Sequence, residues 1–382
     1  MKNVALVTCF LNNYGACLQA LALQHEIESL GHNCKILAYV EPQGYRVEDD
    51  FIMFKRRLRN YIGRIIHFRQ RSGQVDAVKF HDAFYKYRKK YLKFDCAKGT
   101  KKTIFYNSFE DLRDVHNRFD AFVCGSDQIW NPIFYRQNHP VYHLRFAGEK
   151  PRIAYAPSIG LSKFPEEYSE TFKTYIADFD YLSIREQAGA DIIKDLCAKD
   201  AEVVLDPTLL AGAEFWNSVV KSKAKVPYRE YIACYIFSNT KRAAEYIKKV
   251  QETTGLPVVY FNISDLDYSA LDAYCCTYAS PVDFLNVIKN SKFVLTDSFH
   301  GTAFSIIFNK EFYVFAREQK EFSVDMISRI HSILNMTGLE NRLISLDEPF
   351  EYKENIDYSE ANLKLAEVRK KSKKFLATAL GD

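Results

Sequence analysis

The sequence lacks the features that would place this protein in or across a membrane. Among its 382 residues, no apolar run approaches the length of about 20 residues that a membrane-spanning helix requires. The first residues, MKNVALVTCFL, contain one lysine and only a short apolar run, which predicts a first β-strand rather than a signal peptide. We therefore expect a cytoplasmic protein, and one alternative is a peripheral association with the inner face of the membrane.

Disulfide and metal motifs are also missing. The nine cysteines are an odd number, no two form a C-x-x-C pair, and most lie in apolar surroundings, so we expect reduced core cysteines. The sequence has no H-E-x-x-H motif and no P-loop. An Asp-x-Asp triplet at 265–267 lies in a polar loop and is common by chance. We expect neither a metal nor a bound cofactor.

The composition indicates a large folded protein. Hydrophobic residues make up 47% and charged residues 26% of the sequence, which excludes a disordered chain. The length is sufficient for two hydrophobic cores. Short apolar runs alternate with helical patterns, which predicts βαβ units and parallel sheets. The expected strands lie at 3–10, 33–40, 119–125, 151–160, 181–185, 201–207, 230–238, 256–262, 292–296 and 311–316.

The fold class that we predict is α/β, with two doubly wound parallel-sheet domains facing a cleft. The charged segment KSKAKVPYR at 221–229 has no periodic pattern and is the expected linker. We expect an N-terminal domain over 1–220, a C-terminal domain over 229–350, and a helix over 358–380 that packs back across both domains. Further helices are predicted over 14–31, from 241, and over 282–289.

Positive charge is concentrated in one insert of the N-terminal domain. Residues 51–93 contain thirteen Lys or Arg and two Asp, a net charge of +11, whereas the whole chain carries +4. Aromatic and aliphatic residues recur near helical spacing between the basic ones. The insert is either a basic amphipathic helix on an anionic membrane surface or a solvated helix over a core stripe. No nucleic-acid-binding motif accompanies it, so we expect no nucleic-acid partner.

The segment TDSFHGTAFSIIF at 296–308 predicts a binding site. It follows the apolar run KFVL, and Gly301 marks a turn before a helical pattern. A strand–turn–helix junction directs backbone N–H groups into a crevice, which suits a phosphate or a carboxylate. His300 lies in this junction and can exchange a proton near neutral pH. The junction therefore predicts an active site for an anionic substrate, although His300 could also only hold the turn.

Similar polar loops follow other predicted strands. Parallel strands place their carboxyl ends at one edge of a sheet, where α/β proteins bind ligands. Together these loops predict a cleft. They are Asn12–Gly15, Gly125–Asn131, Pro157–Gly160, Arg185–Glu186 and Asp297–Gly301.

These motifs in combination resemble the polysaccharide pyruvyl transferase family. The resemblance extends from residue 3 to about residue 345 and rests on the following segments: NYGACLQALALQ (13–24), GSDQIWNP (125–132), SIRE (183–186), LDPTLL (205–210) and TDSFHGTAFS (296–305). It implies the two-domain fold of B-type glycosyltransferases. It also implies transfer of a pyruvyl group from phosphoenolpyruvate to a sugar, usually as a cyclic ketal, with release of phosphate.

The resemblance also implies roles for individual residues. His300 is the expected proton-transfer group, and Arg185 matches an arginine of the family. In much of the family an Arg-Leu pair precedes the histidine, but here Ser298 and Phe299 stand at those places, so another cation must replace the missing arginine. Arg329 is the candidate that we favour. The full set of expected donor-binding residues is Arg185, Ser298, Gly301, Lys310, Arg317 and Arg329.

On the acceptor side, several assignments have a structural alternative. Asp127 either activates or binds a sugar hydroxyl or caps a helix after Gly125. Trp130 either stacks on a sugar face or packs in the core. Asn13 and Gly15 shape a loop first and contact ligand second. The expected acceptor-binding residues are Asn13, Tyr14, Gly15, Ser126, Gln128, Trp130 and Asn131, with Asp127 as a second catalytic residue.

We thus expect a pyruvyltransferase acting on a hexose of a surface-polysaccharide precursor, with an acceptor that could be linked to a lipid pyrophosphate. Two alternatives stay open. The same helix N-terminus could hold the diphosphate of a nucleotide sugar, which would make the protein a glycosyltransferase. The arginine missing at Ser298 also permits a non-catalytic protein that binds polysaccharide precursors.

Overall fold

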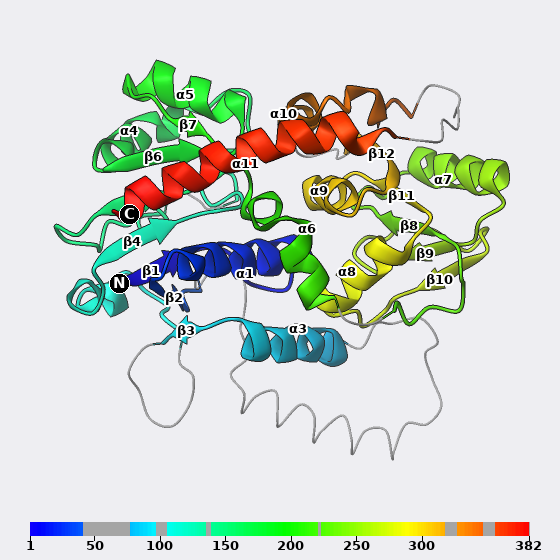
Figure 1. The fold of residues 1–382 in the computed structure, drawn as a ribbon, viewed down its shortest axis with the longest axis horizontal. Coiled ribbons are helices and arrows are strands. Elements are labelled where there is room, and N and C mark those ends of the chain that lie inside the picture. The colour runs from blue at the N-terminus through cyan, green and yellow to red at the C-terminus, as the bar shows by residue number, and fades with distance from the viewer. Residues whose placement is uncertain are drawn as a thin grey trace, which may run out of the picture.

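The computed structural model describes residues 1–40, 77–96, 105–134, 139–220, 223–317, 327–346 and 356–381. The described chain folds into two α/β domains that lie side by side, each built on a parallel sheet (Figure 1). The predicted fold class is confirmed.

The first domain contains a seven-stranded sheet with the strand order β3-β2-β1-β4-β5-β6-β7. Every pairing in it is parallel, so the carboxyl ends of the strands share one edge. The strands are β1 (Asn3–Val7), β2 (Asn33–Leu37), β3 (Phe94–Asp95), β4 (Ala121–Cys124), β5 (Arg152–Ala154), β6 (Tyr181–Ile184) and β7 (Glu202–Val203).

Helices connect these strands and cover the sheet. They are α1 (Tyr14–Ser29), α3 (Ala77–Tyr91), α4 (Ser169–Ala177), α5 (Gln187–Cys197) and α6 (Pro207–Val219), with short 3-10 turns at Glu110–Leu112, Val115–Asn117 and Glu166–Tyr168. Helix α6 follows the last strand of the first sheet. It packs against α1 of the first domain and against α9 of the second domain.

The second domain contains a six-stranded parallel sheet, β10-β9-β8-β11-β12-β13, within the part of the chain that the structure describes. Its strands are β8 (Ile232–Tyr235), β9 (Val258–Tyr260), β10 (Ala273–Cys275), β11 (Phe293–Thr296), β12 (Glu311–Phe315) and β13 (Leu343–Ile344). Its helices are α7 (Lys241–Thr254), α8 (Pro281–Asn290), α9 (Phe299–Ile307) and α10 (Ser328–Thr337), with a 3-10 turn at Glu340–Arg342.

The two domains share one hydrophobic core. In β1, Val4 and Leu6 contribute to this shared core, whereas Ala5 and Val7 face a separate core on the other side of the first sheet. Strand β8 alternates in the same way, and its Tyr235 belongs to the shared core. Successive side chains of a strand point to opposite faces, so each sheet separates two apolar layers. Apolar burial across the interface thus fixes the domains against each other.

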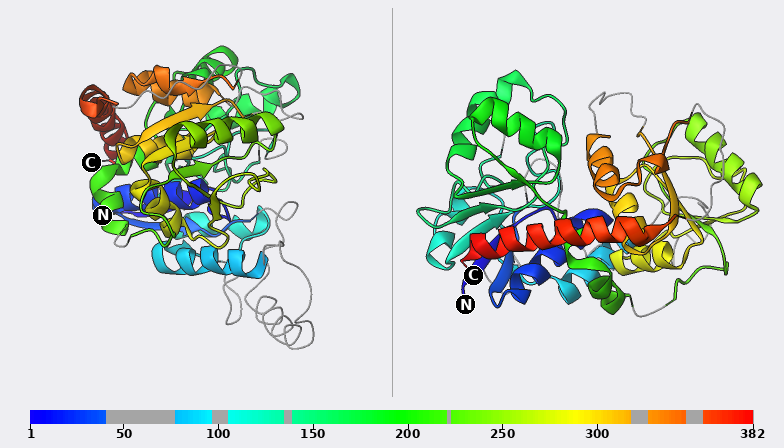
Figure 2. Two further views of the ribbon diagram at one scale, coloured as in Figure 1. Left: turned by 90° about the vertical axis from the view of Figure 1, so that its right-hand side faces the viewer. Right: turned by 45° about the horizontal axis from the view of Figure 1, so that its top comes forward.

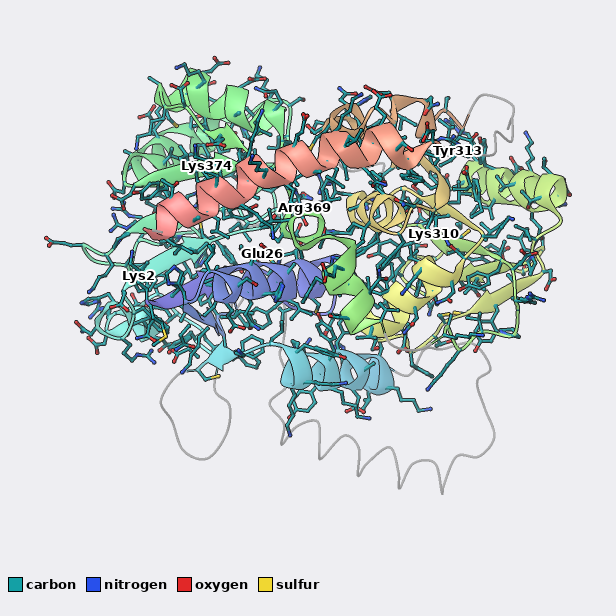
Figure 3. The ribbon with its side chains drawn as sticks, in the orientation of Figure 1. Lys2, Glu26, Lys310, Tyr313, Arg369 and Lys374 are labelled. Atoms are coloured by element: carbon teal, nitrogen blue, oxygen red, sulfur yellow. The ribbon has the colours of Figure 1, made fainter. Side chains whose placement is uncertain are left out.

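The C-terminal helix α11 (Tyr358–Leu380) extends across both domains (Figure 2). It begins on the second domain, where the Tyr358 hydroxyl donates a hydrogen bond to the carbonyl of Lys310. It ends on the first domain, where Lys373 Nζ lies 3.0 Å from Glu26 Oε2 and the ammonium of Lys2 donates to the carbonyl of Leu380. Figure 3 shows Glu26 on α1 and Arg369 and Lys374 on the helix that passes over it.

Three expectations about local structure have different outcomes. The alternative in which Asp127 caps a helix after Gly125 is wrong, because residues 126–134 contain no helix and Asp127 forms an isolated parallel bridge with Pro157. Of the basic insert, residues 51–76 lie outside the described residues. Its last part forms α3, whose Phe84 and Tyr87 are buried in the shared core. Residues 223–229, the described part of the expected linker, contain no helix or strand.

Candidate active site at the domain interface

His300 lies at the second position of α9, directly beyond the carboxyl end of β11. Ser298 is the N-cap, and its hydroxyl oxygen accepts a hydrogen bond from the backbone N–H of Gly301. A Cβ on Gly301 would lie 2.2 Å from Thr296 Oγ1, so only glycine allows the helix to begin this close to the strand. The sequence therefore places the imidazole at the edge of the sheet where ligands bind in α/β folds.

The imidazole of His300 also contacts the first domain. A Cβ on Gly15, in the first turn of α1, would lie 2.1 Å from His300 Nδ1 and 2.4 Å from its Cγ. The α-carbon of Gly15 therefore covers one edge of the ring, and any side chain at this position would displace it. The other ring nitrogen, Nε2, is buried and has no hydrogen-bond partner among the described residues.

Asp206 connects His300 with Arg185. It is the N-cap of α6, and its Oδ1 accepts hydrogen bonds from the backbone N–H and the hydroxyl of Thr208. Its Oδ2 accepts from Arg185 Nη1 at 2.9 Å and from the Ser126 hydroxyl at 3.1 Å. The same oxygen lies 3.9 Å from His300 Nε2. Asp206 is thus the carboxylate that faces the imidazole.

Arg185 is completely enclosed by opposite charge and an aromatic ring. Besides Asp206, its Nη2 lies 3.8 Å from Asp127 Oδ1, and its Nε lies 3.8 Å from Glu186 Oε2. Its guanidinium stacks on the ring of Phe299, 4.3 Å from the ring centre. Burial acts to lower the pKa of Arg185, but the three carboxylates outweigh burial and raise it.

Glu186 fixes the polar loop that follows β5. Its Oε1 accepts three hydrogen bonds, from the hydroxyl of Ser158 at 2.9 Å and from the backbone N–H groups of Ile159 and Gly160 at 2.9 and 3.0 Å. Its Oε2 has no hydrogen-bond partner among the described residues and faces Arg185. This carboxylate therefore joins the loop to the guanidinium.

A second group of cations comes from the second domain. Arg317 follows β12, and Arg329 lies in the first turn of α10. Both line a small pocket, together with Asp297, Phe299, Ile327 and Ile330. With its amide oriented to satisfy both groups, Gln128 of the first domain accepts hydrogen bonds from Arg329 Nη1 at 2.9 Å and Nη2 at 3.1 Å. Phe299 thus contacts Arg185 and also lines the pocket of Arg329.

The surroundings of His300 favour its neutral form. Burial lowers the pKa of His300 from its ordinary value of 6.5, and the positive charges of Arg185 and Arg329 lower it as well. Asp206 and Asp127 act in the opposite direction, but the net shift is downward. A neutral imidazole can accept a proton, and Asp206 is placed to stabilise the cation that results.

The structure brings together most of the residues that the sequence singles out. His300, Gly15, Ser126, Asp127, Gln128, Arg185, Ser298, Gly301, Arg317 and Arg329 all belong to this group of contacts. Asn13 is next to it as the N-cap of α1, and the side-chain amides of Asn131 and Gln128 are in contact at 3.1 Å.

Three of the expected residues are engaged elsewhere. Lys310 lies beyond the C-terminal end of α9, at the opposite edge of the sheet, where its ammonium donates to the carbonyl of Lys289. Trp130 is buried and stacks on His143, so the expectation of a free ring face is not met. The Tyr14 ring stacks on Phe284 across the domain interface, and its hydroxyl donates to a backbone carbonyl. We remove Lys310 from the candidate donor site, since nine residues of helix and loop separate it from His300.

The sequence analysis gave no individual role to three acidic residues of the site, although it named the loops or motifs that contain them. Asp297 directly follows β11, Asp206 lies three residues after the end of β7 as the N-cap of α6, and Glu186 is the N-cap of α5. The Leu-Asp-Pro sequence at 205–207 contains a usable signal, because Asp before a Pro at the first helical position is a strong N-cap pattern. That signal predicts a cap, but it does not reveal that the second carboxylate oxygen faces a histidine from another domain.

Two facing parallel-sheet domains with a polar site between them define the class of the B-type glycosyltransferase fold. A family model described as polysaccharide pyruvyl transferase matches residues 13–319. The chain belongs to this family, which supports a transferase activity in polysaccharide biosynthesis. A comparison with curated protein sequences found no match.

A comparison with solved structures found similar chains at low sequence identity. The S. aureus MnaA structure with UDP is 14% identical, with 99% of this chain and 91% of that chain covered and a TM-score of 0.51. The UDP-GlcNAc 2-epimerase from Neisseria meningitidis, bound to UDP-GlcNAc, is 10% identical, with coverage of 100% and 99% and a TM-score of 0.46. The Streptomyces sp. SF2575 glycosyltransferase SsfS6 is 9% identical, with coverage of 97% and 96% and a TM-score of 0.40.

Neither a metal-ligand cluster nor a membrane-spanning helix is found in the part of the chain that the structure describes. No three His, Cys, Asp or Glu side chains gather there in a way that could hold a metal ion. None of the described helices is both long enough and apolar enough to cross a bilayer.

Proposed function

We propose that the protein transfers a pyruvyl group from phosphoenolpyruvate to two hydroxyls of a hexose in a surface-polysaccharide precursor, which forms a cyclic ketal and releases phosphate. Family membership supports the reaction class. One observation supports the chemistry: His300 Nε2, with no hydrogen-bond partner among the described residues, lies 3.9 Å from the Asp206 carboxylate and beside buried guanidinium groups.

The first step adds one sugar hydroxyl across the enol double bond. The hydroxyl oxygen forms a bond to C2 of phosphoenolpyruvate, and neutral His300 takes the hydroxyl proton. The electron pair of the double bond takes a proton at C3, which converts the methylene into a methyl group. The imidazolium supplies that proton, so the histidine returns to its neutral form. Asp206 stabilises the imidazolium in between.

The second step closes the ketal. The bond from C2 to the phosphate oxygen breaks, and phosphate leaves with that electron pair. The second sugar hydroxyl then forms a bond to C2, and its proton leaves with the phosphate. The products are the cyclic ketal and inorganic phosphate, so no oxidant, reductant or further reactant is consumed.

The acceptor lies, in this proposal, against the first domain. The side chain of Asp127 is 19% exposed, whereas those of Asp206 and Glu186 are completely buried. Asp127 is therefore the carboxylate of this group that a sugar hydroxyl can reach. The loop at Asn13–Gly15 adjoins the same space through the contact of Gly15 with His300.

The test is to incubate the protein with phosphoenolpyruvate and a panel of galactose- and mannosamine-type acceptors, both free and linked to a lipid pyrophosphate. Phosphate release should depend on the acceptor, and the product should show the methyl singlet of a pyruvate ketal by proton NMR. A His300→Gln variant is the control. Turnover of a nucleotide sugar without any consumption of phosphoenolpyruvate would replace the proposal with a glycosyltransferase.

A further inference from the structure

The two arginines that flank His300 differ in how their charge is balanced. Around Arg185, three carboxylates lie within 4 Å of one guanidinium. Arg329 has no carboxylate within that distance among the described residues, and its hydrogen-bond partner there is the neutral amide of Gln128. Arg329 is nevertheless buried, with 6% of its surface exposed. A buried charge without an opposite charge is costly unless a ligand supplies it.

The guanidinium of Arg329 retains donor capacity. Its Nε is buried and has no hydrogen-bond partner among the described residues. Nε of Arg317 and both Nε and Nη2 of Arg185 also lack a hydrogen-bond partner there, but each of these atoms lies 3.8 Å from a carboxylate, and Arg329 has no described carboxylate that close. Arg329 and Arg317 both line the pocket next to α10. Burial is the main cause that lowers the pKa of Arg329 to about 9; the positive charges of Arg185 and Arg317 also lower it, and Glu186 and Asp127 act in the opposite direction. The pocket therefore holds one guanidinium, that of Arg329, without a carboxylate partner among the described residues.

The pocket also contains one carboxylate, but this group is already satisfied. The oxygens of Asp297 accept hydrogen bonds from the backbone N–H groups of Phe237 and Ser238 at 2.8 and 2.7 Å and from the Ser238 hydroxyl at 2.7 Å. Its Oδ2 lies 3.8 Å from Arg317 Nε. The pocket thus combines two guanidinium groups with one carboxylate, whereas the surroundings of Arg185 combine one guanidinium with three.

We propose that the Arg329 pocket, formed by Arg329 and Arg317 with Asp297, Phe299, Ile327 and Ile330, binds the phosphate group of the donor substrate. This assignment rests on the proposed function, since it names the subsite for one group of that donor. Arg185, by contrast, positions Asp206 and Phe299 and does not carry the phosphate. A tetrahedral dianion matches forked guanidinium donors better than a point charge does.

The pocket lies close enough to His300 to take part in one site. Phe299 connects the two, because its ring lines the pocket and lies next to His300 in the chain. Arg329 also influences the charge state of His300. Gln128 binds Arg329 from the first domain, so a phosphate at this guanidinium would be held where both domains meet. The enol carbon attached to that phosphate would then face the imidazole.

The test measures anion binding without turnover, by isothermal titration calorimetry and thermal shift in a phosphate-free buffer. Inorganic phosphate, phosphoenolpyruvate and pyruvate are titrated separately into the full-length protein. The variants are Arg329→Gln, Arg329→Lys and, as a control for net charge, Arg229→Gln at an exposed position. Removing one charge-assisted contact should weaken phosphate and phosphoenolpyruvate binding about tenfold to a hundredfold in Arg329→Gln. Arg329→Lys should recover part of this loss, and Arg229→Gln should bind like the wild type.

Pyruvate, which carries only the carboxylate, should bind with the same affinity to the wild type and to Arg329→Gln. The subsite is refuted if phosphate fails to bind the wild type, if Arg329→Gln binds it equally well, or if pyruvate binding falls as much as phosphate binding. Failure of the proposed function has a different signature, namely phosphate binding that depends on Arg329 without turnover of phosphoenolpyruvate. Should Arg329→Gln not fold, Arg317→Gln provides the same comparison at the other guanidinium of the pocket.

Discussion

The two sides of the candidate site handle positive charge in opposite ways. On the first domain, the Arg185 guanidinium is surrounded by Asp206, Asp127 and Glu186. On the second domain, Arg329 is equally buried but has only the amide of Gln128 as its partner among the described residues. Both side chains lie at helix N-termini, Arg185 before α5 and Arg329 in the first turn of α10. Sequence position and residue type alone therefore do not separate their roles.

This difference shows which parts of the site are complete before a ligand binds. A guanidinium balanced by carboxylates is part of the framework, and removing one of its partners destabilises the fold. A buried guanidinium without an anion destabilises the ligand-free protein, and binding an anionic ligand there is favourable because the ligand supplies the opposite charge. His300 lies between these two sides, so changes on either side should reach it.

The largest effect should come from replacing His300, which lies between the two sides of the site. In His300→Gln, proton transfer is lost, and kcat should fall about 10²- to 10⁴-fold. Phosphate binding should change little, because the Arg329 pocket remains. Pre-steady-state phosphate release and calorimetry measure the two properties on one preparation. A kcat within a factor of three of the wild type would remove His300 from the mechanism.

Asp206→Asn should break the balanced side. Asn is as good an N-cap as Asp, so the start of α6 is preserved and the charge alone is lost. Breaking a buried ion pair by removing one partner costs about 3 kcal/mol, which should appear as a lower urea midpoint with an unchanged slope.

The matched comparison is Arg329→Gln on the other side, where a buried charge without a carboxylate is removed. Its free energy of unfolding should stay equal to that of the wild type or rise. If Arg329→Gln were destabilised as strongly as Asp206→Asn, the two arginines would not differ in how their charge is balanced.

The fold could be predicted from the sequence because its signals are local. Apolar runs such as 292–296 and the alternation of strands with helices depend on neighbouring residues. Gly301 marks the strand–helix junction, although it lies in the first turn of α9 and not in a turn before it. The pairing of the site residues is not local. Asp206 and Arg185 come from different loops of the first domain, and His300 meets Gly15 only because the two domains share a core. The spacing of residues in the sequence does not predict the contact between His300 and Gly15.

The charge balance around the arginines of the site also could not be predicted from the sequence. From the sequence alone, three arginines are equally plausible anion ligands: Arg185, Arg317 and Arg329. Only the packing shows that Arg185 is surrounded by carboxylates. Lys310 demonstrates the limit most simply. It follows His300 by one helix, yet the helix itself carries it to the far edge of the sheet.

Gly15→Ala should disturb the contact between the domains at His300. Alanine favours a helix over glycine by about 1 kcal/mol, so α1 itself should not suffer. The new Cβ would lie 2.1 Å from His300 Nδ1, which forces the ring to move. A displacement of about 1 Å in a catalytic group can reduce kcat about 10²-fold.

A double-mutant cycle tests whether that effect acts through the imidazole. In a His300→Ala background the ring that Cβ would strike is gone, so adding Gly15→Ala should cost no further stability or residual activity. A second loss of similar size in that background would show that Gly15 acts on something other than His300.

The smallest and most specific prediction concerns pH. Burial and the neighbouring arginines lower the pKa of His300 below 6.5, so the free protein holds a neutral imidazole at pH 7. The value of kcat/KM should therefore fall only when the pH approaches this lowered pKa. A phosphate bound at Arg329 cancels one of the charges that lower this pKa, so the acid limb of kcat should lie at higher pH than that of kcat/KM. Arg329→Gln removes the same charge permanently, which should move the kcat/KM limb upward and reduce the separation between the two profiles. Asp206→Asn removes a charge that raises the pKa of His300, so its limb should move downward. Because the two variants are expected to shift the profile in opposite directions, equal shifts, or shifts of one sign, would contradict the opposite charge balance of the two sides.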